Sequence, residues 1–214
     1  YFGSNKTQLF INTNGQIGFD YTGSWANEQR NAQTIPDSTL PNDNISLCWA
    51  DLNEGAGQIT YGVVAGTVAP NQIFVVNFNA VPFFTAGGVL SGQIQLYEAT
   101  QQIQIHVASF TNNVALKTLG IENASGTVGV AATGRNNVNW LVSTPEAWSF
   151  TPFSYTYVWS PATFLSSTTI ANPLASGVTA TTTYTVTVTN LATGCTGTSS
   201  VTVTPSAPIS AASI

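Results

Sequence analysis

Few residues of this chain are of the types that carry out chemistry. Its 214 residues include nine Asp or Glu, four Lys or Arg, one histidine and two cysteines. A catalytic triad needs a histidine between a nucleophile and an acid, but His106 lies in a stretch that alternates between polar and apolar residues. We interpret His106 as a half-exposed strand residue. One histidine and two distant cysteines also cannot form a His/Cys metal cluster.

Carboxylates are the next candidates, because glycoside hydrolysis uses a pair of them on either side of the scissile bond. The residues considered are Asp51, Glu54, Glu98, Glu122 and Glu146. Glu98 and Glu122 adjoin expected hairpin turns, where acidic side chains commonly accept hydrogen bonds from backbone N–H groups. The sequence therefore favours a protein that is not an enzyme.

One short segment has the oxygen-rich composition of a cation site. Asp51, Asn53 and Glu54 follow an expected strand closely, and calcium takes carboxylate, amide and carbonyl oxygens as ligands. Asp37 and Asp43 in the preceding loop could add to them. The spacing is not that of an EF-hand loop, so turn chemistry is favoured over a bound ion. Calcium is the one cofactor that the sequence suggests.

A second segment has the composition of a sugar-binding site. Arg135, Asn136 and Asn137 precede Trp140, and a pyranose is held by polar side chains together with a flat aromatic ring. Trp25, in a long polar loop, is the aromatic residue most expected to be exposed. The competing interpretation, which we favour, is that Arg135 binds loop carbonyls and Trp140 belongs to the core.

The overall composition excludes several classes of protein. Only 6% of the residues are charged, against about 25% in an ordinary soluble domain. The few cations cannot form the basic surface that nucleic-acid binding requires. No apolar run reaches the length of a membrane span. Thr, Ser, Asn and Gln replace the charged residues, which suits neutral β-sheet surfaces and an extracellular location.

Alternating polar and apolar residues predict strands along nearly the whole chain. A hairpin with a two-residue turn is expected at Asn14 and Gly15, and 21–44 is expected to be a long loop. Further strands are expected at 45–51, 58–64, 72–78, 93–97, 102–107, 116–122 and 127–132. At most single helical turns are expected, at 26–33 or 143–147.

Near residue 152 the polar residues change from Gln and Asn to Thr and Ser, which predicts a domain boundary. The predicted fold class is all-β: a jelly-roll-like β-sandwich over 1–152, followed by a reduced Ig-like β-sandwich over 153–214. Cys48 and Cys195 would lie in different domains. A single long-range disulfide and two unbridged thiols both remain open.

Several motifs carry a resemblance to a known class of proteins. YTYVWSPAT (155–163), ATTTYTVTVT (180–189) and GCT (194–196) resemble the Ig-like or PKD-like repeats of very large secreted Bacteroidetes proteins. The earlier motifs resemble the module that precedes such repeats in gliding-motility adhesins exported by the type IX secretion system. WADLN (49–53) is also similar to nidogen-like extracellular domains. These earlier motifs are WADLN, QIQLYE (93–98), GIENASG (120–126), GRNN (134–137) and WSFTP (148–152).

The resemblance implies a non-enzymatic module of a bacterial cell-surface adhesin with a structural or adhesive role. The chain would then be a segment of a longer precursor. Its partners would be neighbouring repeats or subunits, or a surface glycan, without nucleic acid and without membrane insertion. The second domain lacks the first two strands of such a repeat, so a neighbour could complete it in a fibre or array. The alternative is a carbohydrate-binding accessory module of a secreted polysaccharide-degrading enzyme.

Overall fold

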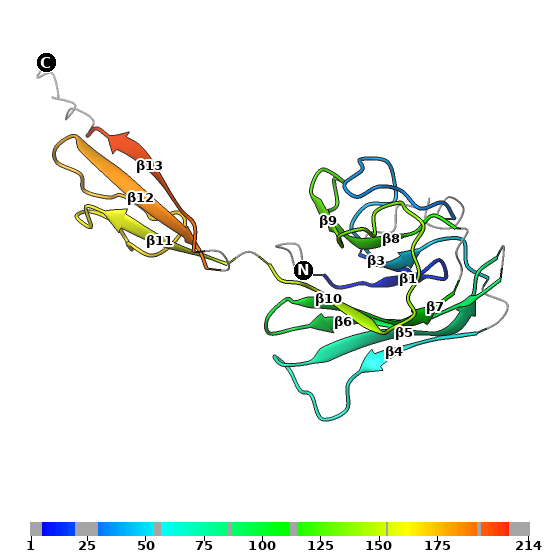
Figure 1. Cartoon of the computed structure of the whole chain (residues 1–214). Helices are drawn as coiled ribbons and strands as arrows, with labels where there is room; N and C mark the ends of the chain where they lie inside the picture. Colours follow the sequence, from blue (N-terminus) through cyan, green and yellow to red (C-terminus); the bar gives the residue numbers. More distant parts are fainter. Residues whose placement is uncertain are drawn as a thin grey trace, which may run out of the picture. The chain divides into compact units, whose positions relative to one another are not determined.

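The computed structural model describes residues 6–19, 30–53, 57–84, 87–111, 115–152, 154–191 and 194–205. The chain divides into two compact units, Tyr1–Pro152 and Phe153–Ile214, which we treat separately. All regular structure in the described residues is β-strand, so the all-β fold class is confirmed (Figure 1). Within the same residues, no helix could cross a membrane.

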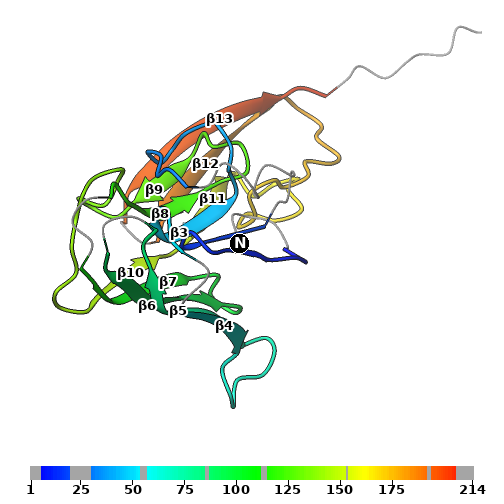
Figure 2. The ribbon, with the colours of Figure 1, turned by 90° about the vertical axis from the view of Figure 1, so that its right-hand side faces the viewer.

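The first unit contains two five-stranded antiparallel sheets that face each other as a sandwich (Figure 2). The strands of the first sheet, in spatial order, are β1 Phe10–Asn12, β2 Gln16–Gly18, β3 Asn44–Trp49, β8 Thr118–Glu122 and β9 Gly129–Ala131. Those of the second are β10 Glu146–Phe150, β7 Ile103–Phe110, β6 Val89–Tyr97, β5 Ile73–Pro82 and β4 Gln58–Val63.

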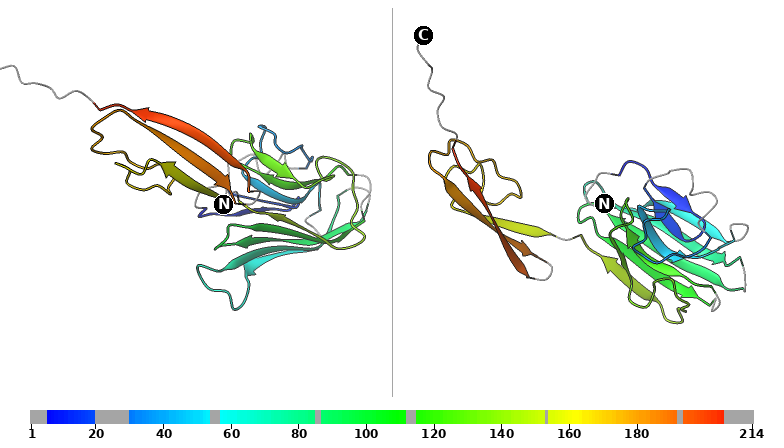
Figure 3. Two further views of the ribbon diagram at one scale, coloured as in Figure 1. Left: turned by 60° about the vertical axis from the view of Figure 1, so that its left-hand side comes forward. Right: turned by 90° about the horizontal axis from the view of Figure 1, so that it is seen from above.

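The strand order of the second sheet follows from its short connections. β4, β5, β6 and β7 are consecutive in the chain and adjacent in space (Figure 3). Hairpins therefore build this sheet as a meander, in place of the jelly-roll-like order expected from the sequence. Residues 146–150 form β10, which pairs with β7 from Glu146↔Val107 to Phe150↔Ile103, so 143–147 is not a helical turn.

The core lies between the two sheets of the first unit. Inward-facing residues of β6 and β7 alternate with outward-facing ones, as the period of a strand requires. Trp49, Phe78 and Phe110 are among the largest fully buried side chains. Each buried large apolar side chain contributes about 1.5–3 kcal/mol. β3 is buried along its whole length, because it lies in the middle of its sheet and contacts both β6 and β7.

The hairpin at Asn14 and Gly15 differs from the expected two-residue turn. Asn12 pairs with Gln16, which leaves three residues in the loop, with Gly15 at a φ of 79°. A three-residue hairpin needs such a left-handed residue at its end. The turn is also docked on β3: a side chain on Gly15 would collide with the carbonyl oxygen of Cys48. The turn type is thus set by this tertiary contact.

The second unit contains one three-stranded antiparallel sheet in its described residues. Its order is β11 Tyr155–Ser160, β12 Thr182–Asn190 and β13 Thr196–Val203. Tyr184 and Val186 of β12 are buried, and the Tyr184 hydroxyl donates to the carbonyl oxygen of Thr163 at 3.0 Å. The loop between β11 and β12 thus supplies a partner for the inward side chains, in place of a second sheet.

The two cysteines are unbridged and differ in accessibility. Cys195 is exposed, whereas Cys48 is fully buried in β3. Burial raises the pKa of the Cys48 thiol to about 12, although nearby Lys117 opposes the rise. Since the thiolate is the reactive form, we expect a thiol reagent at neutral pH to label Cys195 in the native chain and Cys48 only after unfolding. Mass spectrometry of the labelled peptides checks this. Rapid native labelling of Cys48 would contradict the buried placement.

Candidate binding face

The outer face of the second sheet carries a row of amide side chains. We call Gln93, Gln95, Tyr97, Gln102, Gln104 and His106 the amide face. These residues point outward because their neighbours Ile94, Leu96, Ile103 and Ile105 are buried in the core, and successive side chains of a strand point to opposite faces. His106 is half-buried on this face and belongs to β7, which confirms its interpretation as a half-exposed strand residue.

The amides are connected by hydrogen bonds across and along the strands. Gln95 Nε2 donates to Gln93 Oε1 at 2.6 Å, and the Tyr97 hydroxyl lies 2.8 Å from Gln95 Oε1 and 3.2 Å from Gln104 Oε1. Gln104 Nε2 donates to Gln102 Oε1 at 3.0 Å. Such a network fixes the side-chain orientations before any ligand arrives, so less entropy is lost on binding.

The network extends to the neighbouring strand β10 and to His106. Gln102 Nε2 donates to Ser149 Oγ at 2.8 Å, and His106 Nε2 lies 3.1 Å from Gln104 Oε1. Cross-strand pairing places Gln95 opposite Gln104 and Gln93 opposite His106. The result is an ordered surface of uncharged donors and acceptors over three strands.

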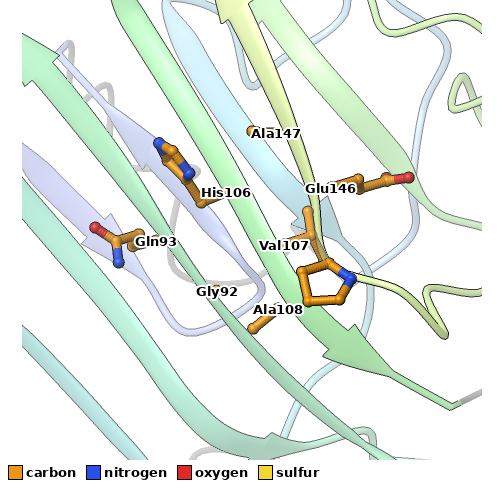
Figure 4. A pocket seen from close by; sticks show the side chains of 8 residues that line it. Gly92, Gln93, His106, Val107, Ala108, Glu146 and Ala147 are labelled. Atoms are coloured by element: carbon orange, nitrogen blue, oxygen red, sulfur yellow. The ribbon is translucent and has the colours of Figure 1, made fainter.

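Two wide, open hollows flank Gln93 on this sheet. The first, of about 250 Å³, is shown in Figure 4, with Gln93 and His106 on adjacent strands. Its lining residues are Gly92, Gln93, His106, Val107, Ala108, Pro145, Glu146 and Ala147. The second, of about 420 Å³, lies over β4 and β5 and includes Thr60, Val75 and Asn77. Both are shallow surfaces for contact, unlike the enclosed pockets that usually hold small molecules.

The residues predicted to bind sugar have structural partners. Trp140 is only 6% exposed, and its ring meets that of Phe110 edge-on with centroids 4.4 Å apart. Its Nε1 donates to the carbonyl oxygen of Lys117 at 3.2 Å. The Arg135 guanidinium lies 4.6 Å from the Trp140 ring centroid. The ring thus lies in the core with a cation beside it, which is not the arrangement of an open sugar platform.

Arg135, Asn136 and Asn137 each connect separate segments. Arg135 forms a two-point ion pair with Glu146, with contacts of 2.9 and 3.2 Å. Burial alone would raise the pKa of Glu146, but hydrogen bonds from Arg135 and Trp148 outweigh burial and lower it. Asn136 exchanges two hydrogen bonds with the backbone of Ile35. The backbone N–H of Asn137 donates to Thr118 Oγ1 of β8 at 2.8 Å.

The residues predicted to bind calcium are partly outside the described ranges. Glu54 lies outside them, as does Trp25, the aromatic residue expected to be exposed. Asp51 and Asn53 form backbone bridges: Asp51 O accepts from Phe84 N, and Asn53 N donates to Pro82 O. In the described ranges there is no group of three or more His, Cys, Asp or Glu side chains suited to a metal.

Lys117 and Glu122 are two of the buried charged residues, and neither was singled out from the sequence as a core residue. Lys117 is fully buried near Phe83 and Phe110, and its Nζ donates to the carbonyl oxygen of Ala115 at 2.7 Å. Burial lowers the pKa of Lys117.

Glu122 is 2% exposed at the end of β8. Burial raises its pKa to about 7, although a hydrogen bond from the Asp37 backbone opposes the rise. The local sequence does not indicate that Lys117 or Glu122 would be buried.

Comparison with known proteins gives one match. The model of a family described as NIDO related matches residues 1–164, which is more than half of the chain. The match covers the sandwich unit, including every residue of the amide face, and extends through β11. Comparisons with curated proteins and with solved structures give no significant match.

Proposed function

Since the chain belongs to the NIDO-related family, whose domains are modules of an extracellular type, we propose that it is a non-enzymatic, adhesive module of a bacterial cell-surface protein. The amide face is the observation that carries this proposal. It is broad, uncharged and internally hydrogen-bonded, which suits contact with a neutral macromolecule. The motif resemblance to secreted Bacteroidetes adhesins supports the surface location, export by the type IX system and a part in gliding motility.

The partner whose chemistry fits the amide face is a neutral surface glycan. Glutamine side chains offer both donors and acceptors, which match sugar hydroxyls that both donate and accept. With so few charges on the chain, the contact does not depend on ion pairs. Binding should therefore change little with salt, in contrast to recognition of an anionic polymer, which weakens steeply as salt increases.

Replacing Gln95 and Gln104 together by alanine tests this assignment. We expect the double variant to lose at least about tenfold in binding to glycan-coated surfaces or whole cells, equivalent to about 1.4 kcal/mol. Stability should change by less than about 1 kcal/mol, because the side chains are half-exposed. Surface plasmon resonance with the full chain at low and high salt measures both affinity and salt dependence.

Gln8→Ala is the matched control, because Gln8 is exposed and lies outside the second sheet. It should bind like the wild type. Unchanged binding by the Gln95/Gln104 double variant, with the fold intact, would remove the amide face from the proposal.

The second unit supports a role in assembly. β13 is an edge strand of its sheet, and seven of its eight residues are exposed. An uncovered edge pairs readily with another strand, so we propose that β13 pairs with a neighbouring repeat or a second copy. Lysine in place of Ser200 and Thr202 should block the pairing and leave a monomer in sedimentation velocity. Thr179→Lys, in the exposed loop before β12, is the control. A wild-type chain that stays monomeric at high concentration would contradict this pairing.

The second candidate function is a carbohydrate-binding accessory module of a secreted polysaccharide-degrading enzyme. The hollow over β4 and β5 favours it, since Val75 offers an apolar floor beside the amides of Asn77 and Gln93. An accessory module would bind purified insoluble polysaccharide as well as it binds cells. An adhesive module would prefer intact cell surfaces, so a side-by-side pull-down separates the two.

A further inference from the structure

Two strands leave one side of their backbones open at the edge of a sheet. In the described part of the chain, β4 pairs only with β5, and β13 pairs only with β12 (Figure 1). Neither strand contains a charged residue or a proline, and no bulge interrupts either register. Charges, prolines and bulges are the features that usually protect an edge. Both strands can therefore accept another strand along their open sides.

The other edge strands of the described sheets are short, charged or covered. β1 and β9 have three residues each. β10 carries Glu146, which forms the ion pair with Arg135. On the open side of β11, the Trp159 N–H donates to the carbonyl oxygen of Thr168 at 2.9 Å. Among these strands, β4 and β13 are the edges best suited to pairing.

Each of the two strands also exposes apolar residues that pairing would cover. Ile59 of β4 packs partly against the core, so Tyr61 and Val63 point to the same side of the sheet. They are 69% and 48% exposed. On β13, Val201 lies opposite the buried Tyr184 and is 49% exposed. On both strands, the exposed apolar residues therefore lie on the face that is turned toward the interior of the unit.

The hydrogen bonds that each strand already makes determine which of its residues can bond to a new strand. Val64 N donates to Ile73 O, so even-numbered residues of β4 bond to β5 and odd-numbered residues are directed outward. Asn190 N donates to Cys195 O, so odd-numbered residues of β13 bond to β12. The even-numbered residues of β13 are therefore the ones whose backbone groups are directed outward.

These positions fit a parallel pairing of β4 with β13. In a parallel ladder, an outward-directed residue bonds to the two residues that flank its opposite neighbour. Tyr61 can thus lie opposite Val201 and bond to the backbones of Ser200 and Thr202, which joins an aromatic ring to a β-branched side chain on one face. An antiparallel pairing would instead place Tyr61 opposite a hydroxyl residue such as Ser200.

We propose that β13 of one copy of the chain adds in parallel to the open edge of β4 in a second copy. This inference rests on the proposed pairing of β13 and names its partner. The contact joins two different surfaces, so it is heterologous and can repeat from copy to copy, as a fibre or array requires. Residues 153–214 contain no Asp, Glu, Lys, Arg or His, so no charged side chain of the second unit opposes the contact.

The first test blocks each edge separately in the full chain. Thr60 and Gly62 lie opposite Ser200 and Thr202 in the proposed register, and a Cβ on Gly62 would meet no atom within 4 Å. We call Thr60→Lys/Gly62→Lys the β4 variant and Ser200→Lys/Thr202→Lys the β13 variant. Each should remain monomeric in sedimentation velocity at a concentration at which the wild type forms oligomers. Ala99→Lys, in the exposed turn between β6 and β7, should assemble like the wild type.

Mixing the two variants tests whether the two edges pair with one another. Each variant keeps the edge that the other has lost, so an equimolar mixture should form a one-to-one dimer that grows no further. Misfolded chains could not complement each other in this way. Thr60→Glu/Gly62→Glu, combined in one chain with Ser200→Lys/Thr202→Lys, should restore oligomers, because opposite charges then face each other across the contact.

The results separate the β4 contact from the proposed pairing of β13. Oligomers of the β4 variant alone would show that β13 pairs with another surface, and would overturn only the β4 contact. A mixture of monomeric variants that stays monomeric would overturn it as well. Oligomers of the β13 variant alone, or a wild-type chain that is monomeric at every concentration, would overturn both proposals.

Discussion

Replacement of Trp140 by alanine should destabilise the sandwich unit by about 3–5 kcal/mol, the cost of emptying a large aromatic site in a core. Three contacts are lost together: the edge-on packing with Phe110, the hydrogen bond to Lys117 O and the guanidinium of Arg135 beside the ring. Loss of the indole also leaves buried Lys117 O without that donor.

Trp140→Phe separates packing from hydrogen bonding, because it keeps an aromatic ring and removes only Nε1. We expect it to cost about 1–2 kcal/mol. Hydrogen-exchange mass spectrometry of peptides from β7 and β8, across a urea series, reports on this unit within the full chain. If Trp140→Ala left their protection unchanged, the ring would not be part of the core, and the sugar-platform interpretation would regain support.

The sandwich unit should lose stability as pH rises from about 5 to 8. The folded-state pKa of Glu122 is raised from 4.5 to about 7, chiefly by burial. The folded state therefore holds a proton that the unfolded chain has released between these values, so increasing pH favours unfolding. A shift of 7 − 4.5 = 2.5 units corresponds to about 3 kcal/mol, fully developed above the folded-state pKa.

Glu122→Gln should remove most of this dependence, because the amide cannot ionise and its oxygen can still accept the Asp37 N–H. The pKa values of Asp37 and Glu146 are lowered, so these two carboxyl groups change the stability only at pH values below the range from 5 to 8. Urea unfolding at several pH values measures the slope of stability against pH for the wild type and for Glu122→Gln. Equal slopes in wild type and variant would show that Glu122 is not a buried proton acceptor.

The all-β fold could be predicted because its signals are local. Alternation in 102–107 predicted which residues of β7 face outward, and Asn123 to Gly126 marked the turn between β8 and β9, which pair from Gly120↔Ala131 to Glu122↔Gly129. The turn at Gly15 was harder, because its three-residue form depends on docking against Cys48. The order of the strands in the sheets could not be predicted from the sequence, because it depends on which hairpins pack together in space.

The sites were less predictable because they, too, depend on tertiary contacts between distant parts of the chain. Whether Trp140 lies open or buried depends on Phe110 and Lys117, which the local sequence around 134–140 does not reveal. The buried position of Glu122 likewise depends on the Asp37 backbone, which lies far away in the chain and donates to Glu122 Oε2.

The measurement that tests the central proposal most directly follows the side-chain amide resonances of the full chain by NMR as cell-surface glycan is added. Binding at the amide face predicts that the NH₂ signals of Gln93, Gln95 and Gln104 shift together and saturate, at both low and high salt. Shifts confined to other residues, or no saturable change at any glycan concentration, would contradict the assignment of this face as the adhesive surface.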